Sequence, residues 1–204
     1  METKEKNREK ILKILFKEPF FDHTASSLSK TLAISRQGIW KTLNKLSKEN
    51  LVHLKSIANT KNSASNIILN LKNSITQKTI SLILEKEALN YERYRDNFKK
   101  LEKHTLFTIL FGSILHSPKE ANDIDILVIV KTRKDFKEVE HILLEAQQTQ
   151  IKKIHAIDLT KEEIKNELKN KNKAYLDSLK KGVVLFGQEN FIEFIKEISN
   201  EQGN

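Results

Sequence analysis

The chain has 204 residues, of which 36 are Lys or Arg and 27 are Asp or Glu, giving a formal net charge of +9. This length is enough for one medium domain or two small ones, each with a modest core. The chain contains no cysteine, which excludes disulfides, zinc–thiolate sites and thiol nucleophiles. No apolar run is long enough to cross a membrane and no signal peptide pattern opens the chain, so we expect a cytoplasmic protein without membrane contact.

The positive charge is concentrated in the first third of the chain. Residues 1–72 contain 14 Lys and Arg against 6 Asp and Glu, whereas residues 101–204 contain 16 against 17. Such an asymmetry is typical of a polyanion-binding module joined to a domain with another task. A general abundance of lysine would produce the same excess, so the local sequence pattern must decide between the two interpretations.

Three helices are predicted in the first fifty residues. The first carries apolar residues between positions 11 and 16 and ends near Pro19, because proline disfavours helical geometry in the residue before it. Thr24 and Ser35 can each accept a backbone hydrogen bond at a helix start, which places a second helix at about 25–32 and a third after Ser35. Two helices joined by so short a turn are typical of a helix-turn-helix motif.

The third predicted helix separates an apolar side from a polar one. At roughly one hundred degrees per residue the apolar side falls within about sixty degrees, so we expect it to face inward; it comprises Ile39, Leu43, Leu46 and Asn50. The opposite side offers lysine and amide groups of the kind that contact phosphates and base edges in a duplex groove. With the neighbouring arginine, the candidate DNA-binding residues are Arg36, Gln37, Lys41, Asn44 and Lys48.

A predicted hairpin follows this helix. Residues 51–57 and 66–71 have the composition of two strands, and a polar turn separates them. With this wing, residues 8–72, and above all the stretch TASSLSKTLAISRQGIWKTLNKLSKENLVHL, resemble the winged helix-turn-helix family. The resemblance implies that the third helix enters the major groove of double-stranded DNA while Lys55 and Lys61 of the wing touch the DNA backbone. A winged helix used for protein contacts or dimerisation is the alternative.

A long linking helix is predicted next. Residues 74–103 contain neither glycine nor proline, and apolar residues recur in them at steps of three and four. The stripe is interrupted by Glu87 and fits either the coiled-coil seam of a homodimer or packing on the neighbouring domains. A dimer would suit a winged helix that reads an operator with two-fold symmetry.

Two carboxylates are predicted to lie side by side at the start of a buried strand. The apolar strand at residues 105–111 ends at Gly112-Ser113, and the next strand opens with Asp123 and Asp125. Since side chains alternate along a strand, both acids project to one side, which is unfavourable unless a cation or a shared proton neutralises them. Oxygen ligands of this kind suit Mg²⁺ or Mn²⁺ bound together with substrate phosphates, and a Gly-Ser turn can hold such phosphates.

The order strand, Gly-Ser, nine residues, Asp-x-Asp, strand resembles the signature of the polymerase-beta-like nucleotidyltransferase superfamily, in particular its minimal single-domain members. The resemblance covers about residues 104–190. It implies that the Gly-Ser turn holds a nucleoside triphosphate and that the two acids are catalytic metal ligands. The family often has a basic residue and a second glycine just after the turn, and in this chain those places hold Ile114 and Ser117.

The family also has a third carboxylate on a neighbouring strand, for which residues 151–159 are the candidate. Asp158 is predicted as the third catalytic residue, and the third metal ligand is either Asp158 or His155. His155 stands about where the acid is expected, whereas Asp158 faces the other way in a regular strand. Asp158 also precedes Thr160 and Glu163, which match a helix capping box, so a structural role is the alternative. Without a third ligand, the resemblance implies weak nucleotide binding or lost catalysis.

The sequence therefore predicts an α/β (α+β) protein in three parts: a winged helix-turn-helix domain at 1–72, a linking helix at 73–103, and a nucleotidyltransferase-like domain with a small mixed sheet at 104–204. The leading hypothesis is a metal-dependent nucleotidyltransferase that transfers a nucleotide from a nucleoside triphosphate to an acceptor and is fused to a DNA-binding module. The alternative is a DNA-binding transcriptional regulator whose C-terminal domain is catalytically inactive and only binds a ligand.

Overall fold

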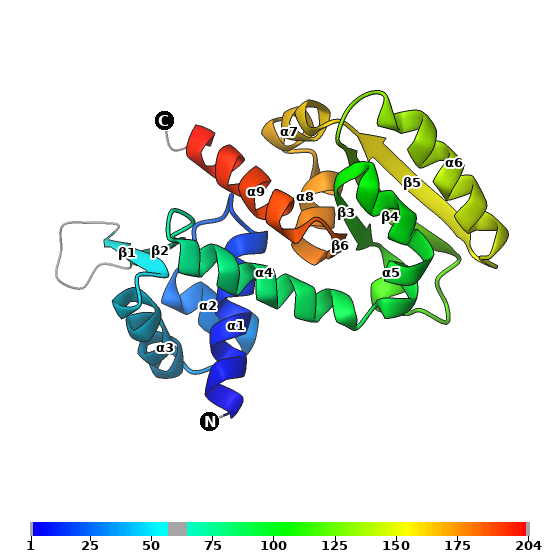
Figure 1. Cartoon of the computed structure of the whole chain (residues 1–204). Coiled ribbons are helices and arrows are strands. Elements are labelled where there is room, and N and C mark those ends of the chain that lie inside the picture. Colours follow the sequence, from blue (N-terminus) through cyan, green and yellow to red (C-terminus); the bar gives the residue numbers. More distant parts are fainter. Residues whose placement is uncertain (1, 57–64, 203–204) are drawn as a thin grey trace. The chain divides into compact units, whose positions relative to one another are not determined.

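A computed structural model describes residues 2–56 and 65–202 of the chain (Figure 1). The chain divides into two units, residues 1–83 with 199–204 and residues 84–198. Helices and strands are mixed in each unit, as the sequence predicts. In the part of the chain that the structure describes, none of the helices combines the length and the apolar character needed to span a membrane.

The first unit begins with three helices at the predicted places, α1 (Glu2–Lys17), α2 (Ala25–Leu32) and α3 (Arg36–Lys48). Both predicted caps are present. Thr24 Oγ1 accepts a hydrogen bond from the Ser27 backbone N–H at 3.1 Å, and Ser35 Oγ accepts one from the Gly38 N–H at 3.2 Å. These side chains satisfy backbone donors that the first turn of a helix leaves without partners, so they determine where each helix begins.

The predicted wing follows α3 as two antiparallel strands, β1 (Val52–Ser56) and β2 (Ser65–Leu69). The backbone N–H of Ile67 in β2 also donates to the His23 carbonyl at 2.8 Å, which ties the wing to the segment before α2. The predicted wing residue Lys61 lies outside the described residues. The core of this unit includes the fully buried side chains Ile11, Leu12, Leu28, Ile39, Leu43 and Leu46.

The single long helix predicted over residues 74–103 is wrong. The segment forms α4 (Ser74–Leu89), α5 (Glu92–Phe98) and the 3₁₀ helix η1 (Lys99–Lys103). At the end of α4 the Asn90 side chain donates to the Lys86 carbonyl at 3.2 Å, so an amide side chain caps the last turn in place of the next backbone N–H. Phe98 and Leu101 are then completely buried in the core of the second unit. Burial of these two side chains therefore overrides the continuous helical period.

The second unit is built on a mixed four-stranded sheet with the strand order β5-β4-β3-β6. Its strands are β3 (Thr105–Phe111), β4 (Asp123–Val130), β5 (Lys153–Leu159) and β6 (Val183–Phe186). Strand β3 is antiparallel to both β4 and β6, whereas β4 and β5 are parallel and are connected by α6 (Asp135–Gln148). A short 3₁₀ helix, η2 (Ser113–Leu115), follows the end of β3.

Helices cover both faces of this sheet. On one face, Ile124, Ile126 and Val128 of β4 share a core with residues of α5 and α6. On the other face, α7 (Lys161–Lys169), α8 (Lys173–Lys181) and α9 (Gln188–Gln202) pack, with the Phe107 ring of β3 centred 5.1 Å from the Phe191 ring of α9. Strand β5 lies at the edge of the sheet, so the second face stays open to solvent beside the start of β4.

Candidate metal centre and nucleic-acid interface

Strand β4 begins with two carboxylates on one face. The side chains of Asp123 and Asp125 are 32% and 24% exposed, whereas Ile124 and Ile126 are buried on the opposite face. This alternation follows from the two-residue period of a strand. Further along the same face Leu127 is buried, so the two acids stand at the rim of the covered part of the sheet. A ligand can therefore reach them from solvent.

The turn after β3 packs directly against the second acid. Antiparallel pairing aligns Phe111 with Asp125. The next residue, Gly112, has a φ of 82°, a backbone conformation that residues other than glycine rarely adopt. A Cβ atom added at Gly112 would lie 2.1 Å from Oδ2 of Asp125. Glycine is thus required at this position, because it lets the backbone of the turn and the carboxylate approach each other.

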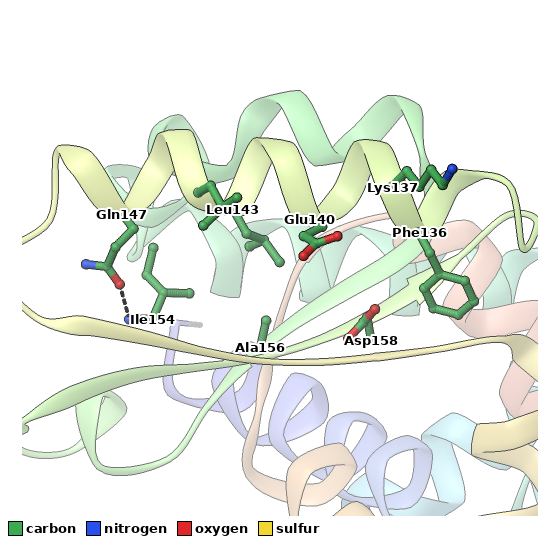
Figure 2. Close-up of a pocket in the computed structure, with 9 residues that line it drawn as sticks. Phe136, Lys137, Glu140, Leu143, Gln147, Ile154, Ala156 and Asp158 are labelled. Atoms are coloured by element: carbon green, nitrogen blue, oxygen red, sulfur yellow. Dashed lines mark hydrogen bonds between the residues drawn. The ribbon is translucent and has the colours of Figure 1, made fainter.

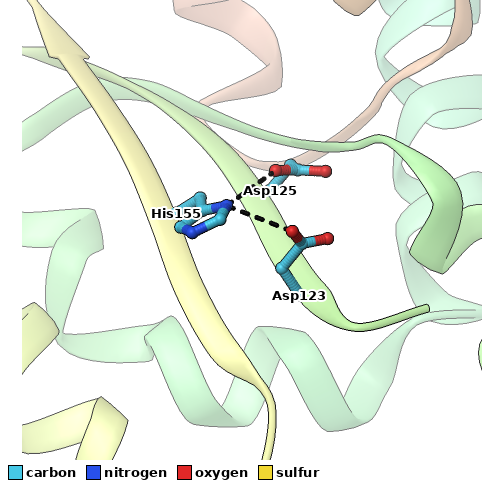
Figure 3. A group of neighbouring side chains, drawn as sticks. All are labelled: Asp123, Asp125 and His155. Atoms are coloured by element: carbon cyan, nitrogen blue, oxygen red, sulfur yellow. Dashed lines mark ion pairs between the residues drawn. The ribbon is translucent and has the colours of Figure 1, made fainter.

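A histidine from the neighbouring strand completes the group. The parallel register of β4 and β5 aligns His155 with Asp125. Nδ1 of His155 lies 3.2 Å from Oδ2 of Asp123 and 3.7 Å from Oδ1 of Asp125 (Figure 3). Among residues 2–56 and 65–202, this is the group of three whose ligand atoms lie within 4.8 Å of one another and could surround a metal ion. Two carboxylates and an imidazole so placed fit a divalent cation.

The electrostatics of the pair favour a cation between the acids. Burial raises the pKa of the Asp125 carboxyl above its ordinary value, and the charge of Asp123 raises it further. The nearby His155 ring acts in the opposite direction and lowers that pKa. Because both carboxylates are disfavoured as neighbouring ions, a positive charge placed between them removes the repulsion.

Asp158 does not join this group. It is aligned with Val128, three residues along β5 from His155, and an odd separation in a regular strand turns it to the opposite face. On that face Ile154, Ala156 and Asp158 line a pocket of about 560 Å³ together with α6 (Figure 2). Of the two candidates for the third position, the structure thus brings His155, and not the predicted catalytic residue Asp158, beside the acids.

The predicted DNA-contact side of α3 is exposed to solvent. Ile39, Leu43 and Leu46 on the other side are completely buried, as their spacing predicts. Lys55 on β1 is exposed as well. The exposed candidate DNA-binding residues of α3 are Arg36, Gln37, Lys41, Asn44 and Lys48. A continuous polar and basic helix face is thus available to a partner.

Asn50 is not part of the buried side of α3, which corrects the sequence prediction. The helix ends at Lys48, and Asn50 is exposed with a left-handed φ of 58°. Its carbonyl accepts hydrogen bonds from the side-chain amides of Asn70 and Asn73, each at 3.0 Å. The helical period places a residue correctly only while the helix continues, and here it ends two residues earlier.

Two family models match separate parts of the chain. Residues 7–60 match the HTH domain, and residues 94–190 match the family described as Polymerase beta, Nucleotidyltransferase. The chain joins a helix-turn-helix domain to a polymerase-beta nucleotidyltransferase domain. No curated protein matches the chain. The first match contains α2 and α3, and the second contains the Gly-Ser turn, both acids of β4 and His155.

The two departures from the nucleotidyltransferase pattern after the Gly-Ser turn have structural explanations. Ile114 is completely buried and belongs to the core beneath the sheet, so its position contributes packing in place of a positive charge. The Ser117 N–H donates to the Ser113 carbonyl at 2.9 Å, and Ser117 is not among the described residues with positive φ. The turn in the nucleotidyltransferase domain therefore keeps its shape without a second glycine.

Two features of the nucleotidyltransferase domain are not apparent from residue types alone. The sequence does not reveal that the Gly112 backbone contacts the Asp125 carboxylate, because this contact depends on the pairing of β3 with β4. The sequence names His155 as a candidate for the third position, but its alignment with Asp125 comes from the register of the β4 and β5 pair.

Proposed function

We propose that this protein is a metal-dependent nucleotidyltransferase that carries a DNA-binding domain. The observation that carries the proposal is the direct packing of Gly112 against the Asp125 carboxylate. This packing brings a turn that can bind phosphate next to two acids that can bind a metal ion. Backbone amides of the turn and the exposed Ser113 hydroxyl would hold triphosphate oxygens. Asp123 and Asp125 would hold Mg²⁺ or Mn²⁺.

The proposed reaction transfers a nucleoside monophosphate to a nucleophilic acceptor. A bound divalent cation would neutralise the triphosphate and stabilise the charge that develops on the leaving group. The acceptor atom forms a bond to the α-phosphorus while the bond from the α-phosphorus to the bridging oxygen breaks. Pyrophosphate leaves, and the acceptor proton passes to water. The turn orients the triphosphate throughout, so that the acceptor and the leaving oxygen lie in line.

The test of this proposal is the release of pyrophosphate from each nucleoside triphosphate, with Mg²⁺ or Mn²⁺, by the full chain. Asp123→Ala combined with Asp125→Ala should lower the rate about a thousandfold, equivalent to about 4 kcal/mol of transition-state stabilisation. Asp158→Asn is the matched control, because it removes a charge from the other face of β5, and it should retain the activity. Equal rates for the wild type and the double variant would contradict the proposal.

A second candidate function is a transcriptional regulator whose nucleotidyltransferase domain binds a ligand without turnover. The observation that favours it is the imidazole of His155 at the place of the third carboxylate, which makes the metal-binding group less negative than three carboxylates would be. Calorimetric binding of a nucleoside triphosphate by a wild-type protein that releases no pyrophosphate would support the regulator. Product formation that depends on the acid pair would exclude it.

For the first domain, we propose binding of double-stranded DNA, with the exposed face of α3 in the major groove and Lys55 on the DNA backbone. The net positive charge of residues 1–72 supports this role. A cytoplasmic homodimer that joins two such domains on a symmetric operator is the assembly we propose. Sedimentation at micromolar concentration tests it, and a monomer with and without DNA would contradict it.

A further inference from the structure

We propose that His155 is itself a metal ligand and that it shifts the preference of this centre from Mg²⁺ towards Mn²⁺. The inference rests on the proposed function in one respect, because it takes Asp123 and Asp125 as the other two protein ligands. The inference concerns the third ligand position of the metal centre, where the structure has the imidazole nitrogen of His155 in place of a carboxylate oxygen.

The start of β5, just before the histidine, is anchored by the side chains of Lys152 and Gln147. Lys152 donates from Nζ to the carbonyl of Ala121, two residues before Asp123. Gln147 at the end of α6 donates to the Lys152 carbonyl at 3.1 Å and accepts from the Ile154 N–H at 2.8 Å. From Lys153 onward, β5 pairs with β4 without a register shift. His155 is therefore held beside the acids by backbone pairing and needs no rearrangement to reach them.

Among the described side chains of β5, no other can replace His155 on the face of the sheet that carries Asp123 and Asp125. Lys153 is aligned with Asp123 and carries a positive charge, and Ile157 is aligned with Leu127 and is apolar. Asp158 faces the pocket beside α6. Among the described residues of the strand, His155 alone presents a metal-ligating atom to the acid pair, at 3.2 Å from Oδ2 of Asp123.

The two aspartates and the histidine differ in charge and in softness from a set of three carboxylates. Two carboxylates and an imidazole that binds a metal through its free nitrogen lone pair carry two negative charges in place of three. Mg²⁺ is a hard ion that prefers oxygen ligands in octahedral geometry and dehydrates reluctantly. An imidazole nitrogen is a better ligand for first-row transition metals than for Mg²⁺. The exchange of a carboxylate for His155 should thus reduce the affinity for Mg²⁺ more than the affinity for Mn²⁺.

The affinity experiment compares both ions on the full chain without nucleotide and with a non-hydrolysable nucleoside triphosphate. Bound Mn²⁺ is measured by electron paramagnetic resonance, and Mg²⁺ by its competition with Mn²⁺. His155→Asp should lower the ratio of Mn²⁺ to Mg²⁺ affinity about tenfold, and His155→Ala should lower Mn²⁺ affinity about tenfold. Asp158→Asn, the matched control on the other face of the strand, should change neither. Since the His155 side chain is 45% exposed, these substitutions should leave the fold intact, which circular dichroism checks.

Pulsed electron paramagnetic resonance provides a second readout that does not depend on affinity. Bound Mn²⁺ should show coupling to a nitrogen nucleus in the wild type and in Asp158→Asn, and this coupling should be lost in His155→Asp. Tight Mn²⁺ binding without nitrogen coupling, or an affinity ratio unchanged in His155→Asp, would overturn the inference and leave the proposed function standing. A wild type that binds neither ion, with or without nucleotide, would overturn both.

Discussion

The exposed face of α3 and the acid centre of the second unit are built in different ways. Helix α3 is a local structure, in which Ser35 caps the first turn and a period of 3.6 residues sorts the buried from the exposed side chains. The acid centre draws on three separate segments, namely the turn after β3, the start of β4 and the middle of β5. A functional surface on one helix can therefore be predicted from a short stretch, whereas one assembled across strands depends on their register.

The largest effect on folding stability should come from Gly112→Ala at the acid centre. A positive φ and a Cβ at 2.1 Å from Asp125 Oδ2 should destabilise the fold by about 3 kcal/mol and abolish Mn²⁺ binding. Urea unfolding and metal titration measure these changes. Gly38→Ala is the control, because it makes the same substitution within a single helix, α3. We expect it to change the free energy of unfolding by less than about 1 kcal/mol. Normal metal binding by Gly112→Ala would show that the close packing of turn and carboxylate is dispensable.

The next largest effect is expected at the exposed face of α3. Lys41→Ala combined with Lys48→Ala should weaken duplex binding about fiftyfold at 0.1 M salt and reduce the slope of affinity against salt by about 2, because two phosphate contacts are lost. Fluorescence anisotropy over a salt series measures both. Lys137→Ala combined with Lys173→Ala removes the same charge from exposed helix positions of the second unit. If both pairs reduce affinity equally, net charge and not the α3 face determines binding.

A smaller effect is expected at the cap of α7, which the sequence predicts from Thr160 and Glu163 and the structure contains. Thr160→Ala should destabilise the fold by about 1 kcal/mol at neutral pH. Hydrogen bonds from the backbone N–H and the hydroxyl of Thr160 lower the pKa of Glu163 in the folded state. The contribution of these two bonds to folding stability is therefore present above pH 4.5 and is lost as the pH falls through the lowered pKa of the folded state. The difference in stability between the variant and the wild type should thus become smaller in acid, where the hydroxyl bond to the Glu163 carboxylate is lost, but the bond from the Glu163 N–H to Thr160 Oγ1 keeps part of it. Thr31→Ala, at an exposed helical position, is the control.

The smallest effect should be a gain in stability for Asp125→Asn without metal. Burial and Asp123 raise the pKa of Asp125, so the wild type loses stability as the pH rises from 3.8 through the raised folded value. In chelator at pH 7 the variant should have the higher Tm, and below pH 3.8 the difference should vanish. Added Mn²⁺ should reverse the order, since only the wild type retains both carboxylates. A lower Tm for the variant in chelator would contradict the unfavourable pairing of the acids.

Two errors of the sequence analysis share one cause. The interrupted helix at Asn90 and the exposed Asn50 are both places where a helical period was continued beyond the residue at which the helix ends. The selection of Asp158 has a different origin, because it came from the resemblance, whereas the strand period already turned Asp158 away from the acids. The helix caps and the alternation of acids with isoleucines in β4 were predicted correctly, because each depends on neighbours within a few residues.

The sequence by itself determined the helix-turn-helix, the wing strands, the Gly-Ser turn and the shared face of Asp123 and Asp125. Hydrogen bonds and side-chain periodicity within single elements are enough for these features. Only the tertiary structure decided that the Gly112 backbone meets the Asp125 carboxylate and that His155 stands beside the acids. The physical reason is that the register between strands is set by backbone pairing and by the burial of side chains distant in sequence, and a change of one residue moves a side chain to the opposite face.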